Sequence, residues 1–333
     1  LSLNATDMDL DIIDKGEADV SQPGAKTARA QTLYEIVRKL PEGSQVEFSG
    51  DSEGNLLLKS GRSRFSLTCL PTDDFPIMTG GDMSHTFFLP ASEIRGLIDR
   101  TRFAISTEET RYYLNGIYMH AAERNGIKVL RAVATDGHRL AQVIQPVEEM
   151  NFGEVPEIIL PRKALMEIRK VCELMGEIVD ITFDERVAQF SGNRIHFKTR
   201  LIEGKFPNCD PIIPKDNERK STIHRENLIH SLRIVSAIST DKLRPVKLNL
   251  QSGLLKLESE KTEFGEASDE FEVNYDGEPF EIGFNTRYLL DVLNVMKSDE
   301  ILMEFKSPMS PSVIRDPNND IFLSVLMPLR TEW

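Results

Sequence analysis

The stretch "AISTEETR" at residues 104–111 returns as "AISTDKLR" at residues 237–244. Two further pairs share nearly the same displacement: "SGRSRF" at 60–65 with "SGNRIHF" at 191–197, and Phe75-Pro76 with Phe206-Pro207. Self-similarity at a fixed period is the signature of repeated structural units. The sequence therefore predicts copies of one domain of about 130 residues.

Apolar residues recur three and four positions apart in five segments, which predicts amphipathic helices at residues 26–40, 91–106, 161–173, 223–239 and 284–297. Short runs between them, such as "NLLLK" and "IKVLRAVAT", are separated by turn residues and predict antiparallel hairpins. The predicted fold class is α+β, with two helix-plus-strand units in each period. Counting back by one period places the first domain's start about 50 residues before Leu1, so we expect that domain to lack one helix.

The charge distribution limits the partners. The 333 residues carry a formal charge of −13, which disfavours a protein that covers nucleic acid or an anionic membrane with its whole surface. Each of the five helical segments is nevertheless net positive. The pattern predicts a mildly basic helical surface that attracts phosphates without reading bases.

The cysteines and the apolar runs limit the cellular setting. Cys69, Cys172 and Cys209 fit neither a disulfide framework nor a zinc site, so we expect a reducing compartment, no metal and no cofactor. No apolar run approaches the roughly 18–20 residues that span a bilayer, and the first residues lack the basic-then-apolar pattern of a signal peptide. We expect a soluble protein that is not exported.

Two motifs suggest chemistry. "GDSEG" at 50–54 matches the serine hydrolase pattern, but the strands predicted on both sides make it a hairpin turn. "ATDGHRL" at 134–140 holds Asp136 and His138, which are open to three interpretations: a structural turn, a binding site or an acid/base pair. No nucleophile, phosphate loop or dinucleotide motif accompanies them.

Two other segments suggest contacts. "RYYLNG" at 111–116 places Tyr112 and Tyr113 at the start of a predicted strand. They are either a half-buried aromatic pair or a surface for nucleic acid. "SVLMPLR" at 324–330 predicts a docked tail or a partner contact.

Taken in order along the chain, "SGRSRFSLTCLPTDDFP", "RYYLNGIYM", "RAVATDGHRLA", "LPRKAL", "FNTRYLLDVLNVM" and "VLMPLR" closely resemble the bacterial DNA polymerase III beta subunit family, the sliding clamps. The resemblance implies three similar domains, at residues 1–84, 85–218 and 219–333, the first N-terminally incomplete. Their sheets would lie outside and their helices would line the pore of a dimeric ring. It implies a processivity factor on DNA, not an enzyme.

The resemblance also implies an apolar groove between the second and third domains that takes a short peptide, a glutamine followed by leucines and a phenylalanine. His138, Arg139 and Arg330 would rim the groove and orient the peptide. The residues that the resemblance places in its wall are Leu114, Thr135, Gly137, His138, Arg139, Leu140, Pro207, Ile212, Ser312, Val325, Met327, Pro328, Leu329 and Arg330. Thr331, Glu332 and Trp333 depart from the family pattern beside this groove.

Two further surfaces follow from the resemblance. DNA contacts would come from the two tyrosines and from basic residues of the helices: Tyr112, Tyr113, Arg29, Arg100, Arg162, Lys163 and Arg225. Phe65 and Leu67, on an edge strand, would meet Ala237 and Ile238 of the other subunit, closing a ring by heterologous contacts.

The expected partners are double-stranded DNA of any sequence, the polymerase III catalytic subunit, a clamp loader, other polymerases and repair proteins, and a second copy of the chain, but no membrane. The expected location is the bacterial cytoplasm, with nucleoid association during replication. Two rivals stay open: a hydrolase that uses Asp136 and His138, and a monomeric DNA-binding scaffold.

Overall fold

The computed structural model describes residues 1–78, 83–146, 157–239 and 243–329. Within these residues the predicted helical segments each contain one α-helix, which confirms the helical periodicity. The helices are α1 (Ala30–Val37), α2 (Ala91–Thr101), α3 (Arg162–Val171), α4 (Arg225–Val235) and α5 (Thr286–Val295). Short 3₁₀ turns follow three of them: η2 (Arg102–Ala104), η4 (Cys172–Met175) and η5 (Ser236–Ile238).

The strands of the described residues form four antiparallel sheets. The six-stranded sheet has the order β1 (Ser2–Thr6), β2 (Leu10–Lys15), β13 (Ile195–Arg200), β12 (Val187–Gly192), β11 (Ile178–Phe183), β6 (His85–Pro90). The eight-stranded sheet has the order β10 (Ile158–Pro161), β7 (Gly116–Arg124), β8 (Ile127–Thr135), β9 (Arg139–Pro146), β21 (Asn319–Leu326), β20 (Ser312–Asp316), β19 (Glu300–Phe305), β14 (Arg219–His224). The end sheets are β17 (Ser268–Glu272), β16 (Leu254–Ser259), β15 (Pro245–Gln251), β18 (Phe280–Asn285), and β3 (Glu47–Gly50), β4 (Leu56–Ser60), β5 (Ser63–Leu67).

The two larger sheets join parts of the chain that are far apart in sequence. The first hairpin pairs with β13, where Ile12 lies opposite Phe197. The last strand, β21, pairs with β9, where Val325 lies opposite Leu140. The second pairing matters for function because it brings the C-terminal segment beside the turn at 135–139.

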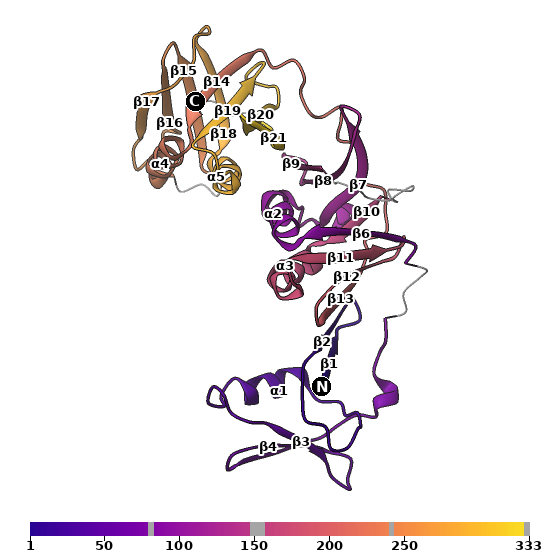
Figure 1. Cartoon of the computed structure of the whole chain (residues 1–333). Coiled ribbons are helices and arrows are strands. Elements are labelled where there is room, and N and C mark those ends of the chain that lie inside the picture. Colours follow the sequence, from indigo (N-terminus) through magenta and orange to yellow (C-terminus); the bar gives the residue numbers. More distant parts are fainter. Residues whose placement is uncertain (79–82, 147–156, 240–242, 330–333) are drawn as a thin grey trace.

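The helices lie together on one side of the molecule. Figure 1 shows a crescent in which the helices face the concave side and the sheets lie outside. α2 packs beside α3, and α4 beside α5. The apolar stripes of α2 to α5 are buried against the sheets; Leu97, Leu165, Leu232 and Leu293 are at most 3% exposed. Their polar faces therefore line the concave surface.

Two motifs are settled by the local structure. Asp51 accepts hydrogen bonds from the amides of Glu53 and Asn55, so "GDSEG" is the predicted hairpin turn between β3 and β4. The placement of Tyr112 and Tyr113 at a strand start was wrong. They lie in a 3₁₀ helix, η3 (Glu109–Leu114), and β7 begins only at Gly116, where a side chain would collide with the carbonyl oxygen of Leu160.

No described helix combines the length and the apolar character needed to cross a membrane.

Candidate functional site

The turn between β8 and β9 is built around the carboxylate of Asp136. Its Oδ1 accepts hydrogen bonds from the backbone amides of His138 (2.9 Å) and Arg139 (3.0 Å). Its Oδ2 accepts from Nε of Arg139, again at 3.0 Å. Both oxygens are thus used to hold the turn, which is the ordinary role of an Asx turn. This favours the structural interpretation over an acid/base pair.

Arg139 connects this turn to the C-terminal part of the chain. Its Nη1 donates to Asp291 on α5 at 2.6 Å, and its Nη2 donates to the carbonyl oxygen of Phe103 at 2.5 Å. The guanidinium also stacks over the ring of Tyr288, 4.2 Å from its centroid. The side chain is only 10% exposed. Arg139 therefore holds elements together, and its donors face protein groups instead of the groove.

An apolar cluster lies under the turn and contains three of the predicted groove residues. Leu114, Leu140 and Val325 are buried together there with four residues that are not among the predicted wall residues: Val133, Ile159, Phe206 and Cys209. Burial raises the pKa of the Cys209 thiol to about 11, so the thiol stays neutral and acts as an apolar wall. We call this set the groove floor.

Exposed apolar side chains stand around the floor. Met327 is 41% and Ile212 is 44% exposed, and Pro207 is exposed beside them. The Met327 amide donates to the carbonyl oxygen of His138 at 2.9 Å, which ties the C-terminal segment to the turn. Exposed apolar groups above an apolar floor indicate a binding surface.

The remaining predicted wall residues have structural roles or lie at the edges. Thr135 Oγ1 donates to the carbonyl oxygen of Arg139, and Gly137 has a φ of +90°, which favours glycine. Ser312 is fully buried in β20. Pro328 and Leu329 are partly buried, and the Leu329 amide donates to the carbonyl oxygen of Gly283. Arg330 and Thr331, Glu332 and Trp333 lie outside the described residues.

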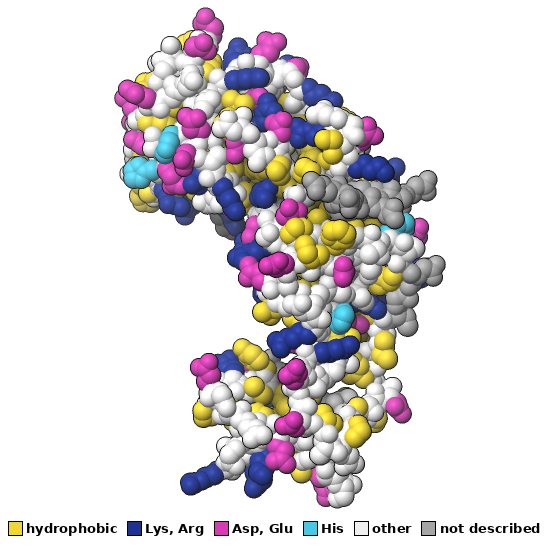
Figure 2. All heavy atoms as spheres, viewed as in Figure 1, with side chains coloured by type: hydrophobic (Ala, Val, Ile, Leu, Met, Phe, Trp, Pro, Cys, Tyr) yellow, Lys and Arg dark blue, Asp and Glu magenta, His cyan; other side chains and the backbone are white. Residues whose placement is uncertain are grey.

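The predicted DNA contacts differ in how accessible they are. Arg29 and Arg162 are exposed, Arg100 is partly buried, and Tyr112 is 54% exposed. Tyr113 packs against the groove floor. Figure 2 shows Lys and Arg side chains along the concave edge, interspersed with acidic ones.

Two of the predicted basic contacts already have partners inside the chain. Lys163 pairs with Asp7 at 2.5 Å. Arg225 donates to the carbonyl oxygens of Leu293 and Ser298, and its side chain is 16% exposed. We therefore expect these two to contribute less to DNA binding than Arg162 does.

The predicted dimer contacts lie at two sheet edges at opposite ends of the chain. Within the described residues β5 is hydrogen-bonded only to β4, and β17 only to β16. Phe65 and Leu67 lie on β5 and are partly buried. Ala237 is exposed and Ile238 is partly buried in η5, which continues α4 beside β17. Unpaired edges with apolar neighbours are typical of strand pairing between chains.

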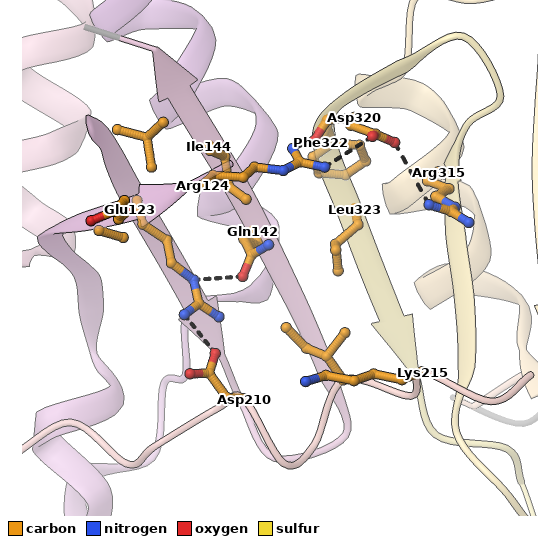
Figure 3. A pocket seen from close by; sticks show the side chains of 14 residues that line it. Glu123, Arg124, Gln142, Ile144, Asp210, Lys215, Arg315, Asp320, Phe322 and Leu323 are labelled. Carbon is orange, nitrogen blue, oxygen red and sulfur yellow. Dashed lines mark hydrogen bonds and ion pairs between the residues drawn. The ribbon is translucent and has the colours of Figure 1, made fainter. Parts of the chain in front are cut away.

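The site has no group of three or more His, Cys, Asp or Glu side chains placed to hold a metal ion in the part of the chain that the structure describes. A cavity of about 310 Å³ lies next to the groove floor, on the outer face of the eight-stranded sheet (Figure 3). No sequence motif marks this cavity, because its lining comes from five strands and one connecting segment.

Comparison with known proteins gives consistent matches along the chain. The sequence profile of the DNA polymerase III beta subunit N-terminal domain matches residues 1–79, that of the central domain residues 88–208, and that of the C-terminal domain residues 210–330. The beta sliding clamp of Caulobacter vibrioides is 46% identical over 332 residues, 99% of this chain and 89% of the relative. That of Escherichia coli is 32% identical over 331 residues, 99% of this chain and 88% of the relative.

Solved structures agree. A crystal structure of the C. crescentus beta sliding clamp with PEG bound to its putative beta-motif tethering region has a TM-score of 0.94 at 45% identity, covering 99% of this chain and 88% of that one. The Bartonella birtlesii clamp bound to griselimycin has a TM-score of 0.94 at 42% identity, with the same coverage.

Proposed function

The chain belongs to the DNA polymerase III beta subunit family, and from this premise we propose that its concave helical surface surrounds duplex DNA and that its apolar groove binds partner peptides. The protein is a DNA sliding clamp, a non-catalytic processivity factor that works as a homodimeric ring. A closed ring cannot leave DNA sideways, so weak phosphate contacts permit sliding while a tethered polymerase stays bound.

The observation that supports encirclement is the placement of all five described helices on the concave side. The family matches adjoin between residues 79 and 88 and between residues 208 and 210. The domain boundaries in the proposal are residue 84 and residue 218, the second just before β14 begins at Arg219. The specific partners in the proposal are the polymerase III catalytic subunit, a clamp loader, and other polymerases and repair proteins. The location that follows is the bacterial cytoplasm, with nucleoid association during replication.

Topological retention tests the encirclement. After loading by a matched clamp loader and gel filtration in moderate salt, we expect the protein to stay on circular DNA and to leave linearised DNA from its ends. Salt weakens phosphate contacts but does not open a ring. Equal retention on both forms would mean binding by contact alone and would support the monomeric scaffold instead.

The groove proposal rests on the pairing of a buried apolar floor with exposed apolar side chains. Leu140 and Val325 are at most 2% exposed, whereas Met327 and Ile212 are 41% and 44% exposed. The backbone amides of these two donate to His138 of the turn and to Cys209 of the floor. A partner's leucine or phenylalanine side chain would bury these groups from water. His138 is exposed at the rim and available for a polar contact with such a peptide.

Met327→Ala tests the groove directly. We expect about tenfold weaker binding of a labelled peptide with a glutamine followed by leucines and a phenylalanine, because a buried methionine contributes roughly 1–2 kcal/mol at an interface. Fluorescence polarisation measures this. Met309→Ala, which removes an exposed methionine from the β19–β20 turn, is the matched control. Equal affinity of both variants would argue against a groove at Met327.

A further inference from the structure

The cavity beside the groove floor is a formed pocket with its own chemistry. It lies on the outer face of the eight-stranded sheet, between β7, β8, β9 and β21, and the segment 209–215 crosses the sheet beside it (Figure 3). Charged side chains and aliphatic side chains both line it. We call it the outer pocket; the lining residues used below are Arg131, Gln142, Ile144, Lys215, Arg315 and Leu323.

The outer pocket continues the groove floor along the same sheet face. On β8 the floor residue Val133 is followed two positions away by Arg131 of the pocket. On β9 and β21 the corresponding steps lead from Leu140 to Gln142 and from Val325 to Leu323. A step of two residues keeps a side chain on the same face and moves about 7 Å along the strand. A peptide lying on the floor can therefore reach the pocket with its next residues.

The connecting segment that forms one wall is held in place from both sides. Asp210 pairs with Arg131 at 2.6 Å, and the Arg131 side chain is only 14% exposed. Phe206 stacks on Tyr118 with ring centroids 4.7 Å apart and planes 3° apart. The wall is thus a built feature, so the pocket has a defined shape before any partner arrives.

The polar groups that remain available in the pocket are hydrogen-bond donors. Gln142 is 4% exposed and its Oε1 accepts from Arg131 Nε at 2.7 Å, which leaves its amide hydrogens for another acceptor. Figure 3 shows the amide nitrogen of Gln142 pointing away from Arg131, toward β21. Arg315 lies on the far side of Leu323 from Gln142, and its guanidinium already pairs with Glu304 at 2.6 Å. Lys215 is exposed and pairs with none of the described acidic residues.

Two of the three acidic residues in the lining, by contrast, already have basic partners. Asp210 accepts from Arg131, and Asp320 accepts from Arg124 at 2.9 Å and pairs with Arg315 at 3.6 Å. Glu123 lies opposite Lys128 in the β7–β8 register. A ligand that supplies acceptors therefore matches this pocket better than one that supplies donors.

We propose that the outer pocket binds an acidic side chain of a residue that flanks the apolar motif of the partner peptide. The proposal rests on the proposed groove function and adds a charge preference to it. The carboxylate accepts a hydrogen bond from the Gln142 amide, and Lys215 on the connecting segment supplies positive charge at the pocket mouth. The aliphatic stem of the acidic residue lies against Ile144 and Leu323, which flank Gln142 in Figure 3. The chain as a whole carries a net charge of −13 and therefore repels acidic peptides. A preference for an acidic side chain must then come from the donors of the outer pocket itself.

Fluorescence polarisation with extended peptides tests the proposal. The probe is the glutamine–leucine–phenylalanine peptide, extended through a glycine spacer at either end by two glutamates or by two lysines. At low salt we expect the glutamate form of one extension to bind about five- to tenfold more tightly than its lysine form, because charge-assisted hydrogen bonds are involved. We expect the difference to shrink as ionic strength rises.

Two variants locate the effect. Lys215→Glu should abolish or reverse the preference, and Gln142→Met, which keeps the side-chain volume, should reduce it without loss of the unextended peptide. Lys297→Glu makes the same charge change just after α5 and should leave the preference intact. Equal affinity for glutamate and lysine extensions at both ends, or a preference that survives Lys215→Glu, would overturn the proposal. Failure of the unextended peptide to bind would overturn the groove function instead.

Discussion

Replacing Arg139 by methionine will lower the melting temperature of the protein by roughly 5–10 °C. We expect the free energy of unfolding to fall by about 3 kcal/mol, and in a protein of this size such a loss shifts the melting temperature by that amount. The guanidinium bridges Asp136 and Asp291, and it also satisfies the carbonyl oxygen of Phe103. Removing it leaves Asp291 and the carbonyl oxygen of Phe103 without this donor, and leaves Asp136 with backbone amides alone, in a site where the arginine is 10% exposed. Unpaired buried charge is among the more costly defects in a protein.

The same substitution will weaken peptide binding, because Asp136 holds the amides of His138 and Arg139 in the turn at the groove rim. We expect the peptide affinity to fall at least tenfold, since a displaced turn at the groove rim costs about 1–2 kcal/mol of binding free energy. Arg139→Lys should behave similarly, because one ammonium group cannot replace a planar fork that meets three acceptors. Differential scanning calorimetry and fluorescence polarisation give the two readouts.

Arg194→Met is the matched control. Arg194, in the turn before β13, pairs with Asp14 of β2 at 3.0 Å, but its side chain is 57% exposed. We therefore expect the free energy of unfolding to fall by less than about 1 kcal/mol. An Arg139→Met protein that melts like the wild type but loses the peptide would place the guanidinium in direct contact with the ligand. That is the role which the family resemblance alone implies.

This role of Arg139 could not be predicted from the sequence. The residue stands in a polar motif at the groove, and the motif says nothing about Asp291, which lies 152 positions further along the chain. The turn itself could be predicted, because Thr-Asp-Gly between two strand patterns has local causes: an Asx turn and a glycine with positive φ. Contacts between residues that are close in sequence can be predicted from the sequence, whereas ion pairs between distant residues cannot.

The same distinction explains the fold. The five helices follow from apolar spacing within each segment. The pairing of β2 with β13 and of β9 with β21 depends on residues more than 170 positions apart, such as Ile12 with Phe197, and these pairings were not predicted. The prediction that Tyr112 and Tyr113 begin a strand failed for a local reason. Aromatic residues favour strands, but here the backbone first turns through η3 before it reaches Gly116, where β7 begins.

The groove floor was predicted only in part, for a related reason. Leu114, Leu140 and Val325 belong to recognisable motifs. Val133, Ile159 and Cys209 resemble ordinary core residues, and only the eight-stranded sheet and the segment crossing it bring them together. The available signal was the period of two in β8, where Val129, Arg131 and Val133 share a face.

Ile238→Asp will dissociate the dimer, with an affinity loss of more than 1,000-fold. Removing a buried isoleucine from an interface costs about 2–3 kcal/mol, and a head-to-tail ring contains two copies of the contact, so roughly 5 kcal/mol is lost in total. In one subunit Ile238 is only partly buried beside β17, whose outer edge has no strand partner within the described residues. Phe65 and Leu67 of a second copy, on the free edge of β5, supply the missing apolar cover in the proposed ring.

Analytical ultracentrifugation measures the expected monomer, and the retention assay measures its consequence: an open ring should leave circular DNA as fast as linear DNA. Ile127→Asp is the matched control. Ile127 is 59% exposed at the β7–β8 turn and belongs to the eight-stranded sheet, which contains neither β5 nor β17, the two strands of the proposed interface. If the Ile238→Asp protein stays dimeric, η5 does not belong to the dimer interface. A monomer that is still retained on circles would separate retention from ring closure and would contradict the topological basis of processivity. Because a carboxylate is tolerated at a wet contact but not at a dry one, the size of the affinity loss also reports how completely the two edges exclude water.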